Sequence, residues 1–202
     1  MPVHNVTEDA TTFTCNAYLL TGDRPTLVDV GAMPGVVDVI DTYVDALDAV
    51  VLTHQHPDHV AELDAVLDAY DPAVYAAADH PARTHRLDDG DRVAVGDTTV
   101  EVVATPGHAD DHVSFVDETM LFSGDVVVHD DAAFEGGSFG RTDNPGQSRS
   151  TLIDSIRRLL DRMPATVEYL YAGHGGSFHG DVAAVVETAL DRARRREPKY
   201  PD

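Results

Sequence analysis

The sequence has one cysteine and one lysine in 202 residues. Since Cys15 stands alone, an intrachain disulfide is impossible, and so is a zinc site built from several cysteines. Lys199 is the only lysine, and the one basic cluster, residues 192–196, lies near the C-terminus. Nucleic-acid binding depends on clustered Lys and Arg side chains that face phosphates. We therefore expect no nucleic-acid partner.

Long apolar runs are also missing. No stretch approaches the roughly 20 apolar residues that a membrane-spanning helix requires. Residues 1–5 lack the basic and apolar regions of a signal peptide. These two absences predict a cytoplasmic protein with no membrane partner. The length suits one well-buried domain, so we expect a single domain over residues 1–202, whose oligomeric state does not follow from the sequence.

Positive charge is scarce, and negative charge is abundant. The chain has 36 acidic and 14 basic residues, which gives a formal net charge of −22. Such self-repulsion destabilises a compact fold in dilute buffer. In molar salt the Debye length shrinks to roughly 3 Å and the repulsion is largely screened. The composition therefore resembles that of proteins from extreme halophiles, and an ordinary acidic protein is the alternative.

Short apolar strands alternate with helical patterns along the chain, with turn residues between them. The pattern predicts strands at residues 13–20, 26–30, 49–52, 74–77, 113–116, 120–122 and 167–171, a hairpin at 93–103 with its turn at 96–97, and helices at 34–44, 59–70, 151–163 and 181–196. Residues 129–148 form a long glycine-rich segment of the kind that often lines an active site. This order predicts an α/β fold with sheets packed together and helices outside.

A cluster of side chains that can bind a metal directly follows the predicted strand at 49–52. The cluster consists of His54, His56, Asp58 and His59. Pro57 disfavours a continuous helix through the motif, which places it on a strand-to-helix turn. Imidazole and carboxylate ligands suit zinc, iron and manganese. Three histidines and an aspartate at this spacing favour a metal site over surface histidines.

Further candidate ligands follow other apolar strands. They are His108, with His112 nearby, Asp125 and His174. Together with the first cluster they exceed the three or four ligands of one catalytic zinc, which predicts two sites that share a bridging carboxylate. Two cations roughly 3.5–4 Å apart can bind and activate one hydroxide, so the predicted chemistry is metal-assisted hydrolysis. Asp29 ends a strand, where it either faces water or accepts hydrogen bonds that orient the metal loop.

The combined motifs resemble those of the metallo-β-lactamase-fold superfamily. The resemblance rests on Thr53-His54-x-His56-x-Asp58-His59, Thr105-Pro106-Gly107-His108, Ser123-Gly124-Asp125 and Gly173-His174-Gly175. It implies a four-layer αβ/βα sandwich with the metals at one edge of the two sheets. In the family pattern, the first metal is held by His54, His56 and His108. The second is held by Asp58, His59 and His174, and Asp125 bridges the two.

Two further residues match the family pattern beside the metals. Asp29 matches a strand-end aspartate that supports the metal loop, and His112 matches a histidine next to the site. Within the superfamily, residues 121–125, 140–143 and 152–156 look most like those of glyoxalase II-like hydrolases. Glyoxalase II cleaves the thioester S-lactoylglutathione. The resemblance therefore implies a small-molecule substrate, thioester hydrolysis, and two zinc ions, with iron or manganese as alternatives.

Two residues have predicted roles in handling the substrate. Asp58 would orient the attacking hydroxide. Arg141 is a candidate for binding a substrate carboxylate, because its planar guanidinium fork matches that geometry, and a structural salt bridge is the alternative. Other functions also fit the motifs. A persulfide dioxygenase would use one iron held by residues matching His54, His108 and Asp125. A lactonase of the same superfamily and a non-catalytic metal-binding or scaffold protein are further alternatives.

Overall fold

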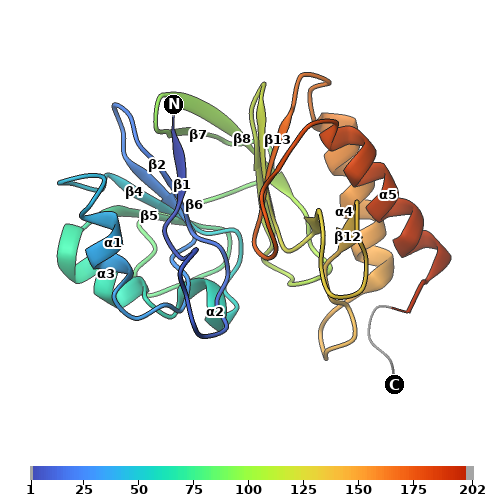
Figure 1. Ribbon diagram of the computed structural model, residues 1–202, viewed down its shortest axis with the longest axis horizontal. Coiled ribbons are helices and arrows are strands. Elements are labelled where there is room, and N and C mark those ends of the chain that lie inside the picture. Colours follow the sequence, from blue (N-terminus) through green and yellow to red (C-terminus); the bar gives the residue numbers. More distant parts are fainter. Residues whose placement is uncertain (1, 199–202) are drawn as a thin grey trace. The chain divides into compact units, whose positions relative to one another are not determined.

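The computed structural model describes residues 2–198, which fall into two compact units with their boundary at Val100 (Figure 1). Unit 1 spans residues 1–100 and unit 2 spans residues 101–202. Each unit contains a mixed β-sheet and its own helices. Within the described residues, no helix is both long and apolar enough to cross a membrane.

Unit 1 is built on a six-stranded sheet in which the strand order follows the chain, β1-β2-β3-β4-β5-β6. The strands are β1 (Val3–Asn5), β2 (Tyr18–Leu20), β3 (Thr26–Val28), β4 (Ala49–Val51), β5 (Ala73–Ala76) and β6 (His85–Arg86). The first three are antiparallel, and β3 to β6 are parallel. The helices are α1 (Val36–Ile40), α2 (Pro57–Val60) and α3 (Leu63–Tyr70).

The core of unit 1 joins the strands to α1 and α3. Leu27 of β3 and Val50 of β4 are fully buried, as are Ile40 of α1 and Val66 of α3. Parallel strands buried on both faces favour continuous apolar sequence, which explains why Ala49–Val51 has no polar residue. The carboxyl end of β4 is therefore held rigidly, and the loop that follows it starts from a fixed point.

The second sheet has the strand order β14-β13-β10-β9-β8-β7, and the unit boundary lies within β8. Its strands are β7 (Arg92–Val95), β8 (Thr98–Ala104), β9 (Val113–Val116), β10 (Met120–Gly124), β13 (Tyr169–Ala172) and β14 (Phe178–His179). A separate pair is formed by β11 (Val127–Val128) and β12 (Ser138–Phe139). Strands β10 and β13 are parallel, so the loops after them leave the same edge of the sheet.

Two long helices, α4 (Arg149–Arg162) and α5 (Val182–Arg195), pack side by side within unit 2 (Figure 1). Each buries one apolar stripe, which includes Leu152 and Ile156 in α4 and Val186 and Ala189 in α5. The side chain of Ser148 caps α4 by accepting a hydrogen bond from the backbone of Thr151 (3.2 Å). This cap fixes the residue at which α4 begins.

The helix predicted at residues 59–70 is instead two helices, α2 and α3. An unbroken helix would pair the backbone N–H of Glu62 with the carbonyl of Asp58. The structure pairs Glu62 N with Gly31 O (3.1 Å) and Asp58 O with Cys15 N (3.2 Å). These long-range backbone bonds replace the helical one and break the helix. The strand predicted at 13–20 is also shorter and covers only Tyr18–Leu20.

Candidate metal centre

The first candidate ligand set lies in unit 1, on the loop between β4 and α2. Asp29 supports this loop from the end of β3. Its side chain is 2% exposed, and its backbone has a φ of 57°, which Asp tolerates better than most residues. Its Oδ1 accepts from Thr53 N (2.8 Å), and its Oδ2 accepts from Thr53 Oγ1 (2.7 Å) and His59 Nδ1 (2.9 Å). Asp29 therefore does not face water.

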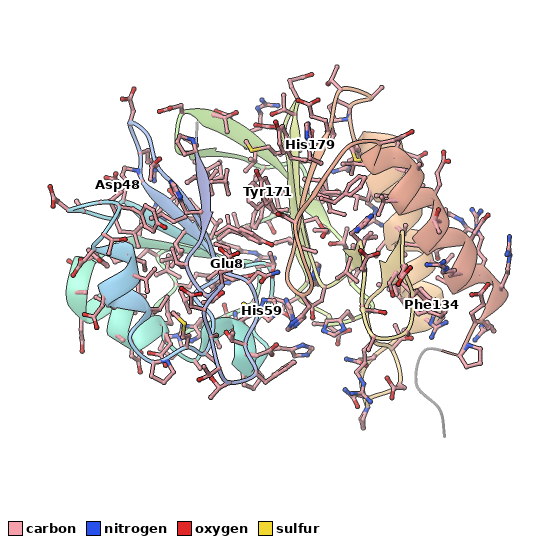
Figure 2. All side chains as sticks on the ribbon, viewed as in Figure 1. Glu8, Asp48, His59, Phe134, Tyr171 and His179 are labelled. Atoms are coloured by element: carbon pink, nitrogen blue, oxygen red, sulfur yellow. The ribbon has the colours of Figure 1, made fainter. Side chains whose placement is uncertain are left out.

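These contacts fix which nitrogen of each imidazole carries the proton. His59, labelled in Figure 2, donates from Nδ1 to Asp29, which leaves Nε2 as the lone-pair nitrogen. The single hydroxyl proton of Thr53 goes to Asp29. The contact between Thr53 Oγ1 and His54 Nδ1 (3.1 Å) is therefore donated by the histidine. The Nε2 atom of His54 then carries the lone pair, which is the form that binds a metal ion.

The positions of the ring nitrogens suit a shared metal ion. His54 Nε2 and His56 Nδ1 are 3.0 Å apart. Two ligands of a tetrahedral zinc, each 2.0–2.1 Å from the ion, lie about 3.3 Å apart. His59 Nε2 is 3.9 Å from Asp58 Oδ2, which is a somewhat wider spacing. The donor set of this loop therefore fits a metal site in both chemistry and spacing.

Cys15, Asp29 and His59 also bring possible ligand atoms within 4.8 Å of one another, and all three residues are buried. The oxygens of Asp29 already accept hydrogen bonds from Thr53 and His59. We therefore interpret this cluster as the support that orients the loop, and not as a metal site of its own.

The second candidate ligand set lies in unit 2, on loops that follow β8, β10 and β13. His108 donates from Nδ1 to the backbone carbonyl of Arg141 (2.9 Å), so its Nε2 carries the lone pair. Asp125 Oδ2 lies 3.3 Å from this Nε2 and 3.4 Å from Nε2 of His174. One carboxylate oxygen is thus at ligand-to-ligand distance from two imidazoles on different loops.

The backbone explains why Asp125 and His174 meet. Parallel strands β10 and β13 end together, and Gly173 N donates to Gly124 O (2.9 Å) just beyond their paired ends. Gly140 packs on the turn that carries Asp125, where a Cβ at position 140 would clash with the carbonyl oxygen of Asp125. The close approach requires glycine at this position.

His112 uses both ring nitrogens for support. Its Nε2 accepts a hydrogen bond from the backbone N–H of Asp125 (3.0 Å), so the ring proton is on Nδ1, which donates to Thr105 Oγ1 (2.8 Å). The hydroxyl of Thr105 in turn donates to Ser114 Oγ (3.0 Å), and the hydroxyl of Ser114 donates to the carbonyl of Ser123 (3.3 Å). This buried chain of hydrogen bonds holds the Asp125 turn, and His112 serves it as a positioning residue.

The family model described as the metallo-beta-lactamase superfamily matches residues 10–174. The chain belongs to this superfamily. It has the metallo-β-lactamase fold, with two mixed sheets and flanking helices, as the sequence predicts. Its histidines and aspartates form candidate metal sites within that fold.

Known members of the superfamily show a range of likeness to the chain. A hydroxyacylglutathione hydrolase of Hydrogenovibrio crunogenus is 32% identical over 154 residues, which cover 75% of this chain and 53% of that protein. A probable metallo-hydrolase of Streptococcus pyogenes serotype M6 is 32% identical over 80% of this chain and 79% of its own. The solved structure of TTHA1623 in a di-iron-bound form is 28% identical, with a TM-score of 0.67 over 87% of this chain and 93% of that one. The chain spans about half the length of the first curated relatives it matches (40–62%).

Arg141 has a partner within unit 2. Its Nε and Nη2 atoms donate to the two carboxylate oxygens of Asp143, each at 2.8 Å. The hydrogen bond with Arg141 is the main reason why the pKa of Asp143 lies below its usual value. The guanidinium predicted to bind a substrate carboxylate therefore already holds a carboxylate of the protein. Its backbone carbonyl has a separate role, because it orients His108.

Sequence reasoning identified Asp29 and His112 but overlooked three further residues that support the candidate ligands. Thr53 and Thr105 each contact a histidine of the site region, and Ser114 extends the support of the Asp125 turn. Thr53 and Thr105 open the motifs that contain His54 and His108, and this adjacency was a usable signal. Ser114 had no such signal, because its contact with Thr105 depends on the pairing of β8 with β9.

Proposed function

We propose that the chain is a binuclear metal-dependent hydrolase that acts on a thioester-like substrate. The observation that carries the proposal is the position of Asp125 Oδ2, 3.3 Å from His108 Nε2 and 3.4 Å from His174 Nε2. A carboxylate oxygen shared by two metal ions needs one imidazole on each side at this spacing. The two imidazoles reach this oxygen from different loops, as the proposed assignment of His108 and His174 to different ions requires.

The proposal assigns both ligand sets to one pair of ions. His54, His56 and His108 would hold the first ion, Asp58, His59 and His174 would hold the second, and Asp125 would be shared by both. The hydrogen bonds within each unit support this assignment, because the Nδ1 atoms of His54, His59 and His108 each donate to a protein oxygen, which makes Nε2 the nitrogen that carries the lone pair. Zinc suits these nitrogen and oxygen donors, and iron and manganese are the alternatives.

The proposed chemistry divides between the ions and the side chains. When bound, such ions supply a water-derived nucleophile at neutral pH and polarise a carbonyl oxygen. Asp58 is partly exposed, and its carboxylate lies beside His59. We propose that this carboxylate accepts a hydrogen bond from the attacking water or hydroxide and thereby orients it. A thiolate leaves readily, so the reaction requires no strong general acid from the chain.

The thioester substrate is supported by relatives with partial coverage. Hydroxyacylglutathione hydrolases of several bacteria are 32–41% identical to parts of the chain. The probable metallo-hydrolase of Streptococcus pyogenes supports hydrolysis, and its name indicates no substrate. We therefore propose a thioester substrate.

A substrate panel tests the proposed function. Thioester, lactone and persulfide substrates are offered to the protein in molar salt, because the net charge of −22 predicts poor stability in dilute buffer. We expect thioester hydrolysis, a loss of at least about a thousandfold on removal of metal by a chelator, and recovery on adding zinc.

Paired histidine variants show whether the activity belongs to the proposed site. His56→Ala should be as inactive as the metal-free protein, whereas His85→Ala, which changes an exposed histidine of β6, should keep full activity. Preferential turnover of the lactone, or oxygen consumption with the persulfide, would reject the thioester proposal. Full activity of His56→Ala would reject the site.

A further inference from the structure

Arg149 lies near the candidate ligand His108 in unit 2, and two separate hydrogen bonds link the two parts of the chain. It is the first residue of α4, and the residue before it, Ser148, donates its backbone N–H to Gly107 O (2.8 Å). Its own Nε donates to Thr142 Oγ1 (2.8 Å). Thr142 follows Arg141, whose carbonyl orients His108. The start of α4 is thus hydrogen-bonded to the residue before His108, and the guanidinium of Arg149 is hydrogen-bonded to the residue after Arg141.

The guanidinium of Arg149 is held in a fixed orientation. Its Cζ lies 4.1 Å from the ring centroid of Phe139, a fully buried residue of β12. Stacking on the ring and the bond from Nε to Thr142 together define the guanidinium plane. Within residues 2–198, the Nε bond is the only hydrogen bond that this guanidinium makes. Its two Nη atoms can therefore donate to a ligand without rearrangement of the side chain.

The surroundings of Arg149 favour an added negative charge. Burial, followed by the positive charge of Arg196, lowers the pKa of Arg149 below its usual value. The nearby carboxylate of Asp143 forms a two-point ion pair with Arg141. In a chain of net charge −22, two further arginines lie in the surroundings of Arg149: Arg141, which shares the neighbour Asp143, and Arg196, whose charge acts on Arg149 itself.

We propose that Arg149 binds a carboxylate on the thiol portion of the substrate, remote from the reacting carbonyl. The inference rests on the proposed thioester hydrolase function and adds the class of substrate, which is an anionic thioester. The carboxylate would take paired hydrogen bonds from the two Nη atoms, the geometry that a planar guanidinium provides and an ammonium does not. Arg141 remains with Asp143 and keeps its role in orienting His108.

The test uses two thioesters that differ in one group, S-acetyl-3-mercaptopropionate and its carboxamide. The measured quantity is the ratio of kcat/KM for the acid to kcat/KM for the amide. We expect the wild type to prefer the acid, and Arg149→Met to lower this ratio by about 10- to 100-fold, as for loss of a charge-assisted hydrogen bond. Arg149→Lys should restore the ratio only in part.

Arg157→Met is the matched control, because Arg157 lies in the same helix and pairs with Asp154 (2.7 Å). It should leave the ratio unchanged. A structural role for Arg149 would lower kcat/KM for both substrates equally, so an unchanged ratio in Arg149→Met would overturn the inference. So would a wild type that prefers the amide or shows no preference.

An equilibrium measurement separates this inference from the proposed function. The probes are the non-hydrolysable ketone 3-(acetonylthio)propionate and its amide, and their dissociation constants are measured by calorimetry on the metal-loaded protein. Tighter binding of the acid that is lost in Arg149→Met supports the anionic site even if no thioester is hydrolysed. Equal binding of the two probes by the wild type would overturn it even if thioesters are hydrolysed.

Discussion

Asp125→Asn is expected to lower kcat/KM for a thioester by at least about a thousandfold and to reduce the bound metal below two ions per chain. The asparagine keeps the shape of the side chain but removes the negative charge that two ions would share. Loss of several kcal/mol of charge stabilisation corresponds to about three powers of ten in rate. Metal content by elemental analysis and steady-state kinetics on the same preparation measure both effects.

The fold should survive this substitution. The turn at Asp125 is held by its backbone N–H, which donates to His112, and the asparagine leaves that bond in place. Asp154→Asn is the matched control, because Asp154 is an exposed aspartate of unit 2 that pairs only with the nearby Arg157 among the described residues. It should retain metal and activity. A fully active Asp125→Asn variant with two ions would contradict the assigned bridge.

Asp29→Ala is expected to destabilise the protein and to impair metal binding together. The alanine leaves the backbone and hydroxyl of Thr53 and the Nδ1–H of His59 buried without their acceptor. Removing one partner of such a buried network costs about 3–5 kcal/mol. For a chain of this size the cost corresponds to a fall in Tm of roughly 10 °C. Thermal unfolding with and without added zinc measures both consequences.

The chain provides a control for the unusual backbone at Asp29. Asp71 also has a positive φ (50°), but it is exposed at the end of α3. Asp71→Ala therefore measures the cost of placing alanine in this conformation, which is about 1 kcal/mol. Asp29→Asn introduces a residue that also tolerates a positive φ, so its change in stability measures the loss of the negative charge alone. If Asp29→Ala costs no more than Asp71→Ala, the supporting role of Asp29 is wrong.

The candidate ligands could be found from sequence because they occur in short motifs at the ends of apolar strands. His54, His56 and His59 are within six residues of one another, and their turn follows directly from β4 and Pro57. The α/β class followed from the order of these strands and helices, and the αβ/βα sandwich followed from the resemblance of the motifs to the superfamily. Both inferences depend on local patterns, which do not require knowledge of tertiary contacts.

Other features depend on contacts between distant residues and could not be predicted. The break between α2 and α3 arises because Gly31 and Cys15 take the backbone bonds of Glu62 and Asp58. A structural salt bridge of Arg141 was one of two alternatives, and its partner Asp143 could not be named, because sequence does not show which acid a guanidinium meets. The orientation of Arg149 depends on Phe139, ten residues earlier, whose place is set by the pairing of β12 with β11.

The central claim is that the chain holds two metal ions through the two ligand sets. The most direct test is the identity and number of ions in protein purified in high salt without added metal. We predict close to two zinc-like ions per chain, reduced in Asp125→Asn but not in Asp154→Asn. A single iron per chain, unchanged by added zinc, would contradict the binuclear site and would favour the persulfide dioxygenase.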